Sequence, residues 1–197
     1  MRLRANGGNP KVTDLLQHAL HAVFISLILS VVGCRSQGDL RTVSKLEVEQ
    51  FIGIWHQIAL IPNFFQSDCA SNTQAEYIYN DNRSITIVNS CLTNTSNKLS
   101  AKGLGVATGN PPDFTKLKVS FVPKPLRWVP FFWGDYWVIS IDSKYNSVLV
   151  GSPNRKYLWV LSRERFMPTT KFNEYLKVAS ENGFDISFLE YDLSTLR

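Results

Sequence analysis

The sequence predicts an all-β fold: an eight-stranded antiparallel up-and-down β-barrel, followed by one α-helix and a ninth strand. Two observations indicate this class. Eight short runs rich in β-branched and aromatic residues recur between residues 53 and 163, and turn sequences separate them. One segment with helical spacing then follows near the end of the chain. With 197 residues, of which 44% are hydrophobic, the chain is long enough for one domain with a buried core.

The eight predicted strands are joined by short connections, which is typical of an up-and-down arrangement. Asn80-Asp81-Asn82 and Ser152-Pro153-Asn154 are examples of the turn sequences between them. The strands are expected at residues 53–61, 73–80, 84–91, 99–107, 114–122, 135–142, 146–152 and 156–163.

The predicted helix begins near Thr169 or Thr170, because either side chain can serve as the N-cap. Gly183 is expected to end it. Residues 185–191 then form the predicted ninth strand. One face of the helix carries the regularly spaced apolar residues Phe172, Leu176 and Ala179.

Residues 1–33 are predicted to be a lipoprotein signal peptide, in which a basic leader precedes a mostly apolar run at residues 19–33. A helix of that length spans only about 22 Å, less than the ~30 Å hydrocarbon core of a bilayer, so a secretory segment fits better than a membrane span. The run ends in Val31-Val32-Gly33-Cys34, which is similar to a bacterial lipobox, whose cysteine thiol takes up the lipid. The alternative is an ordinary signal peptide with an incidental cysteine.

Cleavage before Cys34 would leave a lipidated tether at residues 34–45 and a barrel domain at residues 46–197. Arg35, and not Asp, follows the cysteine, and this points to the outer membrane. The scattered basic residues of the remaining chain form no run or stripe, so nucleic acid is not an expected partner. The formal net charge falls from +5 to +3 on cleavage, because the leader takes with it Arg2, Arg4, Lys11 and Asp14.

Three cysteines in an exported chain leave one odd thiol. Acylation of Cys34 would remove it and leave Cys69 and Cys91 as a pair. These two residues flank a predicted hairpin, and an oxidising periplasm permits a disulfide between them. The alternative is two buried free thiols.

Three segments together resemble the signature regions of the lipocalin family. They are Gly53-Ile54-Trp55, Gly134-Asp135-Tyr136-Trp137 and the late strand from Tyr157 to Arg163. The resemblance covers roughly residues 45–192 and implies a bacterial outer-membrane lipoprotein lipocalin. It also implies that the Arg163 guanidinium lies on the Trp55 indole at the closed end of the barrel, where both residues are structural.

Strand alternation, started from Trp55 and Arg163, predicts which side chains face the barrel interior. The expected lining is apolar with a few hydroxyls, which suits an acyl chain. Tyr79 and Ser140 belong to two of the faces taken to point inward. The predicted ligand-lining residues are Gln57, Ala59, Ile61, Ala75, Tyr77, Tyr136, Val138, Tyr157 and Trp159.

In an up-and-down barrel, alternate connections lie at the same end. The end opposite Trp55 is the open end, and it should carry the connections at residues 62–72, 92–98, 123–134 and 152–155. Two of them are aromatic, and Lys124 and Arg127 accompany the second. Such loops would form a lid over the interior or a surface that dips into lipid, whereas the alternative is that they pack on the outside of the barrel as extra core. The six predicted mouth residues are Phe64, Phe65, Trp128, Phe131, Phe132 and Trp133.

Catalytic and metal-binding signatures are scarce in this sequence. After removal of the signal peptide, His56 is the one histidine left, so neither a multi-histidine metal site nor a cofactor is expected. His56 should face outward, away from any triad inside the barrel. The expected function is therefore binding and not catalysis.

The resemblance implies a lipid-anchored outer-membrane protein, facing the periplasm, that binds or carries fatty acids or lysophospholipids. Three alternatives stay open: a carrier of haem, a pigment or another hydrophobic small molecule; an enzyme that acts on envelope lipids; and a structural protein with a filled barrel. The sequence does not determine the oligomeric state, and a dimer is one open alternative.

Overall fold

The computed structural model describes residues 38–80, 83–109 and 111–197. The predicted signal peptide, the predicted lipidation site at Cys34 and most of the predicted tether lie outside the described residues. Among the residues that are described, no helix is long and apolar enough to cross a membrane.

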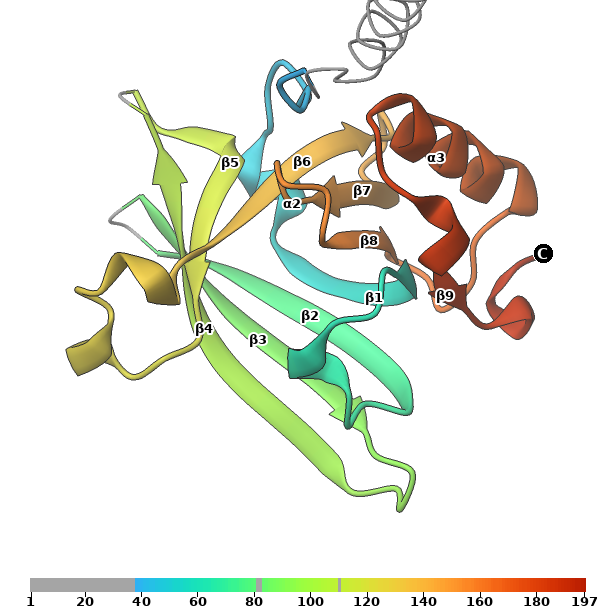
Figure 1. Ribbon diagram of the computed structural model, residues 1–197, viewed down its shortest axis with the longest axis horizontal. Helices are drawn as coiled ribbons and strands as arrows, with labels where there is room; N and C mark the ends of the chain where they lie inside the picture. Colours follow the sequence, from blue (N-terminus) through green and yellow to red (C-terminus); the bar gives the residue numbers. More distant parts are fainter. Residues whose placement is uncertain (1–37, 81–82, 110) are drawn as a thin grey trace, which may run out of the picture. The chain divides into compact units, whose positions relative to one another are not determined.

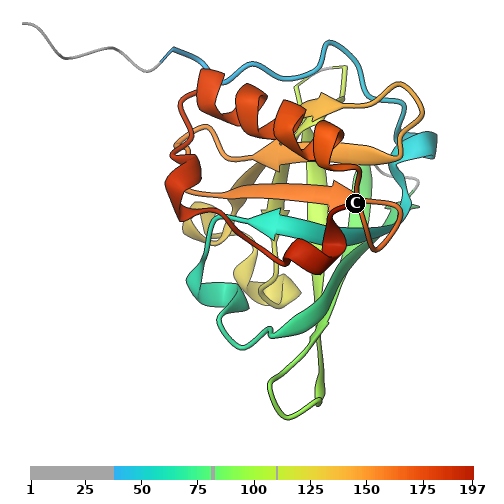
Figure 2. The ribbon, with the colours of Figure 1, turned by 90° about the vertical axis from the view of Figure 1, so that its right-hand side faces the viewer.

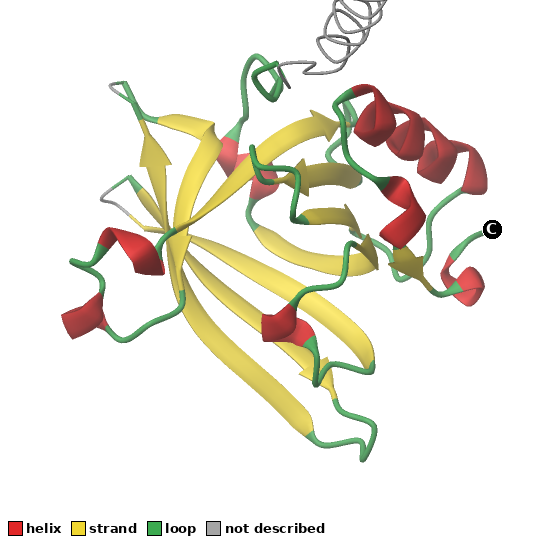
Figure 3. Cartoon of the chain, viewed as in Figure 1, coloured by secondary structure: helices red, strands yellow, loops and turns green. Residues whose placement is uncertain are grey.

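The chain folds into a closed antiparallel β-barrel, as the sequence predicts (Figures 1 and 3). Each strand from β1 to β7 pairs with the next one along the chain, and β1 closes the barrel by pairing with both β8 and β2. The strands are β1 (Gly53–Leu60), β2 (Ser71–Asn80), β3 (Ser84–Leu92), β4 (Lys98–Thr108), β5 (Asp113–Ser120), β6 (Gly134–Ile141), β7 (Ser147–Gly151), β8 (Leu158–Ser162) and β9 (Glu190–Tyr191).

The ninth strand is much shorter than predicted. Residues Ile186–Phe188 form the 3-10 helix η4, because the Asp185 side chain accepts a hydrogen bond from the Ser187 N–H and holds the chain in a turn. Only β9 itself pairs with the barrel, along the second half of β1.

The helix α3 (Thr169–Glu181) packs on the outer face of the barrel (Figure 2). It buries Phe172, Tyr175 and Ala179. The prediction of a threonine N-cap is wrong, because Pro168 takes that position and the Thr169 hydroxyl donates to the carbonyl of Arg197 instead. The helix ends as predicted, next to Gly183, whose φ of +83° favours glycine.

Two apolar clusters lie on opposite faces of the barrel wall. The inner cluster includes Phe51, Trp55 and Leu161, and the outer cluster, which packs against α3, includes Leu158 and Val160. Membership of one cluster or the other therefore reports which way a strand residue faces. A short helix, α2 (Val48–Phe51), precedes β1 and contributes its last residue to the inner cluster.

The closed end of the barrel is built around Arg163, which follows β8. Its guanidinium carbon lies 3.8 Å from the centre of the buried Trp55 ring. Its Nη1 donates to the carbonyl of Ile54 at 2.8 Å, and its Nη2 donates to the carbonyl of Ile52, also at 2.8 Å. The Trp55 indole N–H donates in turn to the carbonyl of Phe51 at 2.8 Å. One cation thus satisfies the carbonyls that α2 and the start of β1 leave without a strand partner.

We expect Arg163→Lys to lower the free energy of unfolding by about 2–4 kcal/mol. Lysine keeps the charge but loses the planar stack on Trp55 and cannot reach several carbonyls at once. Urea unfolding checks this, with the exposed Arg41→Lys as a matched control that should change stability by less than about 0.5 kcal/mol. Equal stability of both variants would contradict the role given to Arg163.

Candidate functional site

The interior of the barrel is lined by large side chains from several strands. Trp159 and Leu161 of β8 face the inner cluster, whereas their neighbours face α3. The other predicted lining residues that the structure places in or against the inner cluster are Ala75, Tyr77, Tyr136 and Val138. Their contact with a ligand remains a prediction.

A β-bulge in β1 overturns part of the predicted lining. The pairing of β1 with β8 shifts between Gln57, which lies opposite Leu161, and Ala59, which lies opposite Val160. The extra residue reverses the alternation, so that Ala59 and Ile61 pack in or against the outer cluster. The prediction that these two residues line the interior is therefore wrong.

Leu60 takes the inward position in their place, because it lies opposite the inward-facing Trp159. A second bulge, in β6, has the same effect on Ser140, which lies opposite the outer-cluster residue Leu149 and thus faces outward. Tyr79 lies opposite the inner-cluster residue Ile85, although its ring is 40% exposed.

The sequence reasoning also missed Phe51. Its side chain is completely buried, and its ring stacks on Tyr77 with centroids 5.1 Å apart. The available signal was its position in an apolar run directly before Gly53-Ile54-Trp55, which the strand prediction left out. Phe51 closes the bottom of the interior.

Two tyrosines meet across the inside of the barrel. The hydroxyl oxygens of Tyr77 and Tyr136 lie 2.7 Å apart. Burial raises the pKa of Tyr77 to about 12 and raises the pKa of Tyr136 well above its ordinary value. The pair holds two O–H groups but shares only one hydrogen bond, so one hydroxyl proton is left for a polar atom of a ligand or for water.

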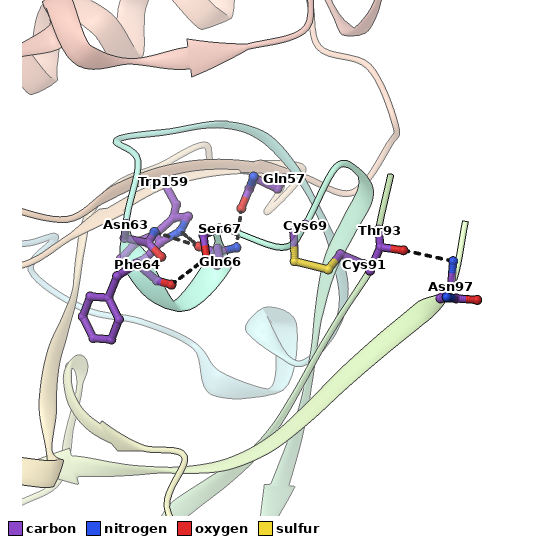
Figure 4. Close-up of a disulfide and its surroundings, with 10 residues drawn as sticks. All are labelled: Gln57, Asn63, Phe64, Gln66, Ser67, Cys69, Cys91, Thr93, Asn97 and Trp159. Carbon is purple, nitrogen blue, oxygen red and sulfur yellow. Dashed lines mark hydrogen bonds between the residues drawn. A yellow bond between two sulfur atoms is a disulfide. The ribbon is translucent and has the colours of Figure 1, made fainter. Parts of the chain in front are cut away.

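Three amide side chains, of Gln57, Asn63 and Gln66, join the loop between β1 and β2 to the barrel wall (Figure 4). The Trp159 indole N–H donates to the Gln66 side-chain oxygen at 2.8 Å, and the Asn63 amide nitrogen donates to the same oxygen at 2.9 Å. The Gln66 amide nitrogen donates to the Gln57 side-chain oxygen at 3.0 Å. Because an indole N–H can only donate, Trp159 sets the orientation of the whole cluster.

A disulfide fastens the other end of the same loop, and the predicted pairing of Cys69 with Cys91 is confirmed (Figure 4). Their Cα atoms lie 5.5 Å apart. The bond links the segment after the 3-10 helix η1 (Phe64–Gln66) to the end of β3. The loop between β1 and β2 is thus attached at both ends.

Aromatic side chains project from two loops at the open end, which is the end where the β3–β4 hairpin extends in Figures 1 and 2. Phe64, Trp128 and Phe131 are 81%, 80% and 87% exposed. They do not form extra core on the outside of the barrel. In contrast, the Phe65 ring contacts Tyr157, with centroids 5.5 Å apart.

The second loop is shaped by two short 3-10 helices, η2 (Lys124–Leu126) and η3 (Pro130–Phe132), each with a proline in its first turn. Trp133 is half-buried, and its indole N–H donates to the carbonyl of Arg127 at 2.6 Å. The half-buried Phe132 contacts Phe131 edge to face. The loop therefore holds its exposed rings outward on a stiff backbone.

In the part of the chain that the structure describes, no group of three or more histidine, cysteine or acidic side chains is placed to hold a metal ion. His56 is half-buried on the outer face of β1, opposite Ser162 of β8, and burial lowers its pKa.

Comparison with known proteins agrees with the geometry of the barrel. A family model described as a lipocalin-like domain matches residues 46–193. This chain belongs to the lipocalin family. Lipocalins are generally binding or transport proteins rather than enzymes.

Two relatives illustrate the range of this family. The lipocalin is 34% identical to temperature-induced lipocalin-1 of Arabidopsis thaliana over 151 residues, which is 77% of this chain and 81% of the relative. It is 32% identical to the outer membrane lipoprotein Blc of Escherichia coli K12 over 161 residues, which is 80% of this chain and 86% of the relative.

Solved structures share the fold at lower sequence identity. Insecticyanin from the tobacco hornworm Manduca sexta matches with a TM-score of 0.57 and 20% identity, covering 80% of this chain and 87% of that one. Lobster apocrustacyanin A1 matches with a TM-score of 0.59 and 14% identity, covering 74% and 78%.

The buried tyrosines make stability depend on alkaline pH. An unfolded tyrosine loses its proton near pH 10, whereas folded Tyr77 keeps it to about pH 12. Because the folded pKa is raised, this contribution to stability is fully present below about pH 10 and is lost as the pH rises toward 12, by about 1.4 kcal/mol per pH unit. We expect Tyr77→Phe to make urea-unfolding stability fall less steeply over this window. The exposed Tyr191→Phe control should keep the wild-type slope, and an unchanged slope for Tyr77→Phe would contradict the assignment.

Proposed function

We propose that this lipocalin binds a single-chain membrane lipid, a fatty acid or a lysophospholipid, with the acyl chain inside the barrel. The observation that carries this proposal is the combination of an inward-facing apolar lining with exposed aromatic loops at the open end. Each methylene group removed from water contributes about 0.8 kcal/mol, so a ligand with a long chain gains most from such an interior.

The polar head of the ligand would stay near the mouth. There the amide cluster leaves the buried Asn63 side-chain oxygen without a partner among the described residues. Deeper in the barrel, the Tyr77–Tyr136 pair offers one unused hydroxyl proton. The Asn63 oxygen can accept from a hydroxyl group of a lipid head, and the tyrosine proton can be donated to a lipid oxygen, because a buried polar atom gains most from a hydrogen bond that it otherwise lacks.

We further propose that the mature protein is anchored through Cys34 in the outer membrane and faces the periplasm. The lipobox-like sequence and the absence of Asp at residue 35 support this placement, and so does the likeness to outer membrane lipoprotein relatives. The anchor would keep the mouth close to its source of lipid.

Haem binding in the interior finds no support from His56, since that side chain lies on the outer face of β1. Lipid binding is therefore the stronger proposal.

Native mass spectrometry of the full chain, after incubation with a total membrane-lipid extract, tests the ligand. We expect retained adducts whose mass identifies an acyl lipid. Ala75→Phe adds a ring to the inner face and should lower the retained fraction about tenfold, because it displaces about two methylene groups of the ligand. Ala101→Phe, at an exposed position of β4, is the matched control. A wild-type spectrum without adducts would refute lipid binding and favour a filled, structural barrel.

The exposed mouth residues should hold the protein on lipid surfaces. Apolar side chains flanked by Lys124 and Arg127 suit the boundary between headgroups and acyl chains, because the rings enter the apolar layer while the cations contact phosphates. We expect the Trp128→Ser/Phe131→Ser double variant, made in a chain that also carries Cys34→Ser to remove the anchor, to co-float about tenfold less with anionic vesicles. Phe188→Ser, which changes an exposed ring elsewhere, should leave flotation unchanged.

A further inference from the structure

A groove of about 580 Å³ opens in the outer surface of the lipocalin, apart from the aromatic mouth loops. We define the outer groove by three segments: residues 56–60 of β1, residues 69–73 before and in β2, and the C-terminal residues 190–197 with Arg165 and Phe166 beside them. Its volume is in the range of sites that hold small molecules.

The outer groove exists because β1 changes partners at its bulge. The pairing of β1 with β2 ends where His56 lies opposite Gln74. Beyond that point β9 pairs with β1, with Ala59 opposite Tyr191. The beginning of β2 therefore separates from β1, and the chain after β9 lies beside the gap (Figure 2).

Two arginine side chains are held in the outer groove by neighbouring groups. The Nη1 of Arg165 donates to the Asn72 side-chain oxygen at 2.6 Å. The Arg197 guanidinium carbon lies 3.7 Å from the centre of the Phe166 ring. The Arg197 N–H donates to the carbonyl of Met167 at 3.1 Å, which holds the C-terminal segment beside the segment that carries Arg165. The remaining guanidinium N–H groups of both arginines have no partner among the described residues.

The His56 ring is a further donor at the outer groove. The imidazole of His56 makes no hydrogen bond in the described part of the chain. The outer groove therefore contains hydrogen-bond donors that have no acceptor among the described residues.

Among the described residues, neither acidic side chain of the outer groove forms an ion pair with Arg165 or Arg197, so the free guanidinium N–H groups stay available. The Asp192 carboxylate accepts from the Ser194 N–H at 2.8 Å and holds a turn. Glu190 lies exposed on β9 and faces water. Glu164 acts on His56, where it opposes the lowering of the imidazole pKa by burial and by Arg165.

We propose that the outer groove is a binding site for a phosphate group, which the two guanidinium groups recognise. Guanidinium N–H groups match the geometry of phosphate oxygens, and the volume leaves room for the group that carries the phosphate. The site goes beyond the proposed acyl-lipid binding, because it lies outside the inner cluster and needs no acyl chain. The phosphate can come from free phosphate or from a phospholipid headgroup.

Isothermal titration calorimetry of the full chain with two probes distinguishes these sources. The first probe is inorganic phosphate, and the second is glycerophosphoglycerol, the deacylated headgroup of an anionic phospholipid. Saturable binding of the first probe alone supports a site for free phosphate, and saturable binding of the second, with or without the first, supports a headgroup site. The absence of saturable binding for both would overturn the proposal.

Variants locate the binding in the outer groove. Arg165→Gln and Arg197→Gln should each weaken it about tenfold, whereas Arg41→Gln, which removes the same charge from an exposed position elsewhere, should change it less than about twofold. Asn72→Asp tests the site without removing an arginine, because the new carboxylate forms an ion pair with Arg165, and it should also weaken binding about tenfold.

Equal affinity of all four variants would show general attraction to a basic protein and overturn the proposal. Retention of acyl lipids by native mass spectrometry should be unaffected by these variants, so the two proposals can fail independently.

Discussion

The stack of Arg163 on Trp55 is the interaction on which the rest of this barrel depends. Trp55 lies in the first of the eight wall-forming strands and Arg163 directly follows the last, and the guanidinium also binds carbonyls of Ile52 and Ile54. An arginine serves here because its planar donor array can stack and make several hydrogen bonds at once. This interaction closes the end of the barrel opposite the aromatic loops.

The bulge in β1 has a wider effect than its single extra residue suggests. It turns Ala59 and Ile61 toward α3 and brings Leu60 to the inner side. On the other edge of β1, the pairing partner changes from β2 to β9. The outer groove is a consequence of that exchange of partners. One local irregularity therefore shapes both the lining of the interior and a polar site on the surface.

The strand order and the disulfide could be predicted from the sequence, because alternation, turn sequences and an even pair of cysteines are local signals. The reversal at Ala59 could not, because a bulge in β1 becomes visible only in its pairing with β8. Phe51 was missed for a similar reason: its role depends on the packing of α2 beneath Tyr77, not on any strand pattern. The outer groove could not be predicted either, because it brings together residues more than 100 positions apart that share no short sequence motif.

At the mouth, the indole N–H of Trp159 fixes the orientation of three amide side chains. Asn and Gln amides accept or donate at either end of the amide group, so their orientation alone would not specify what a ligand meets. The Trp159 indole removes this freedom, because it makes the Gln66 oxygen an acceptor, which turns the nitrogen of Gln66 toward Gln57 and the nitrogen of Asn63 toward Gln66. The cluster then presents an acceptor at Asn63 and donors at Gln57. In the proposed complex, the head of a lipid that entered past Phe65 would meet a surface whose polarity is set by Trp159, the same tryptophan that faces the barrel interior.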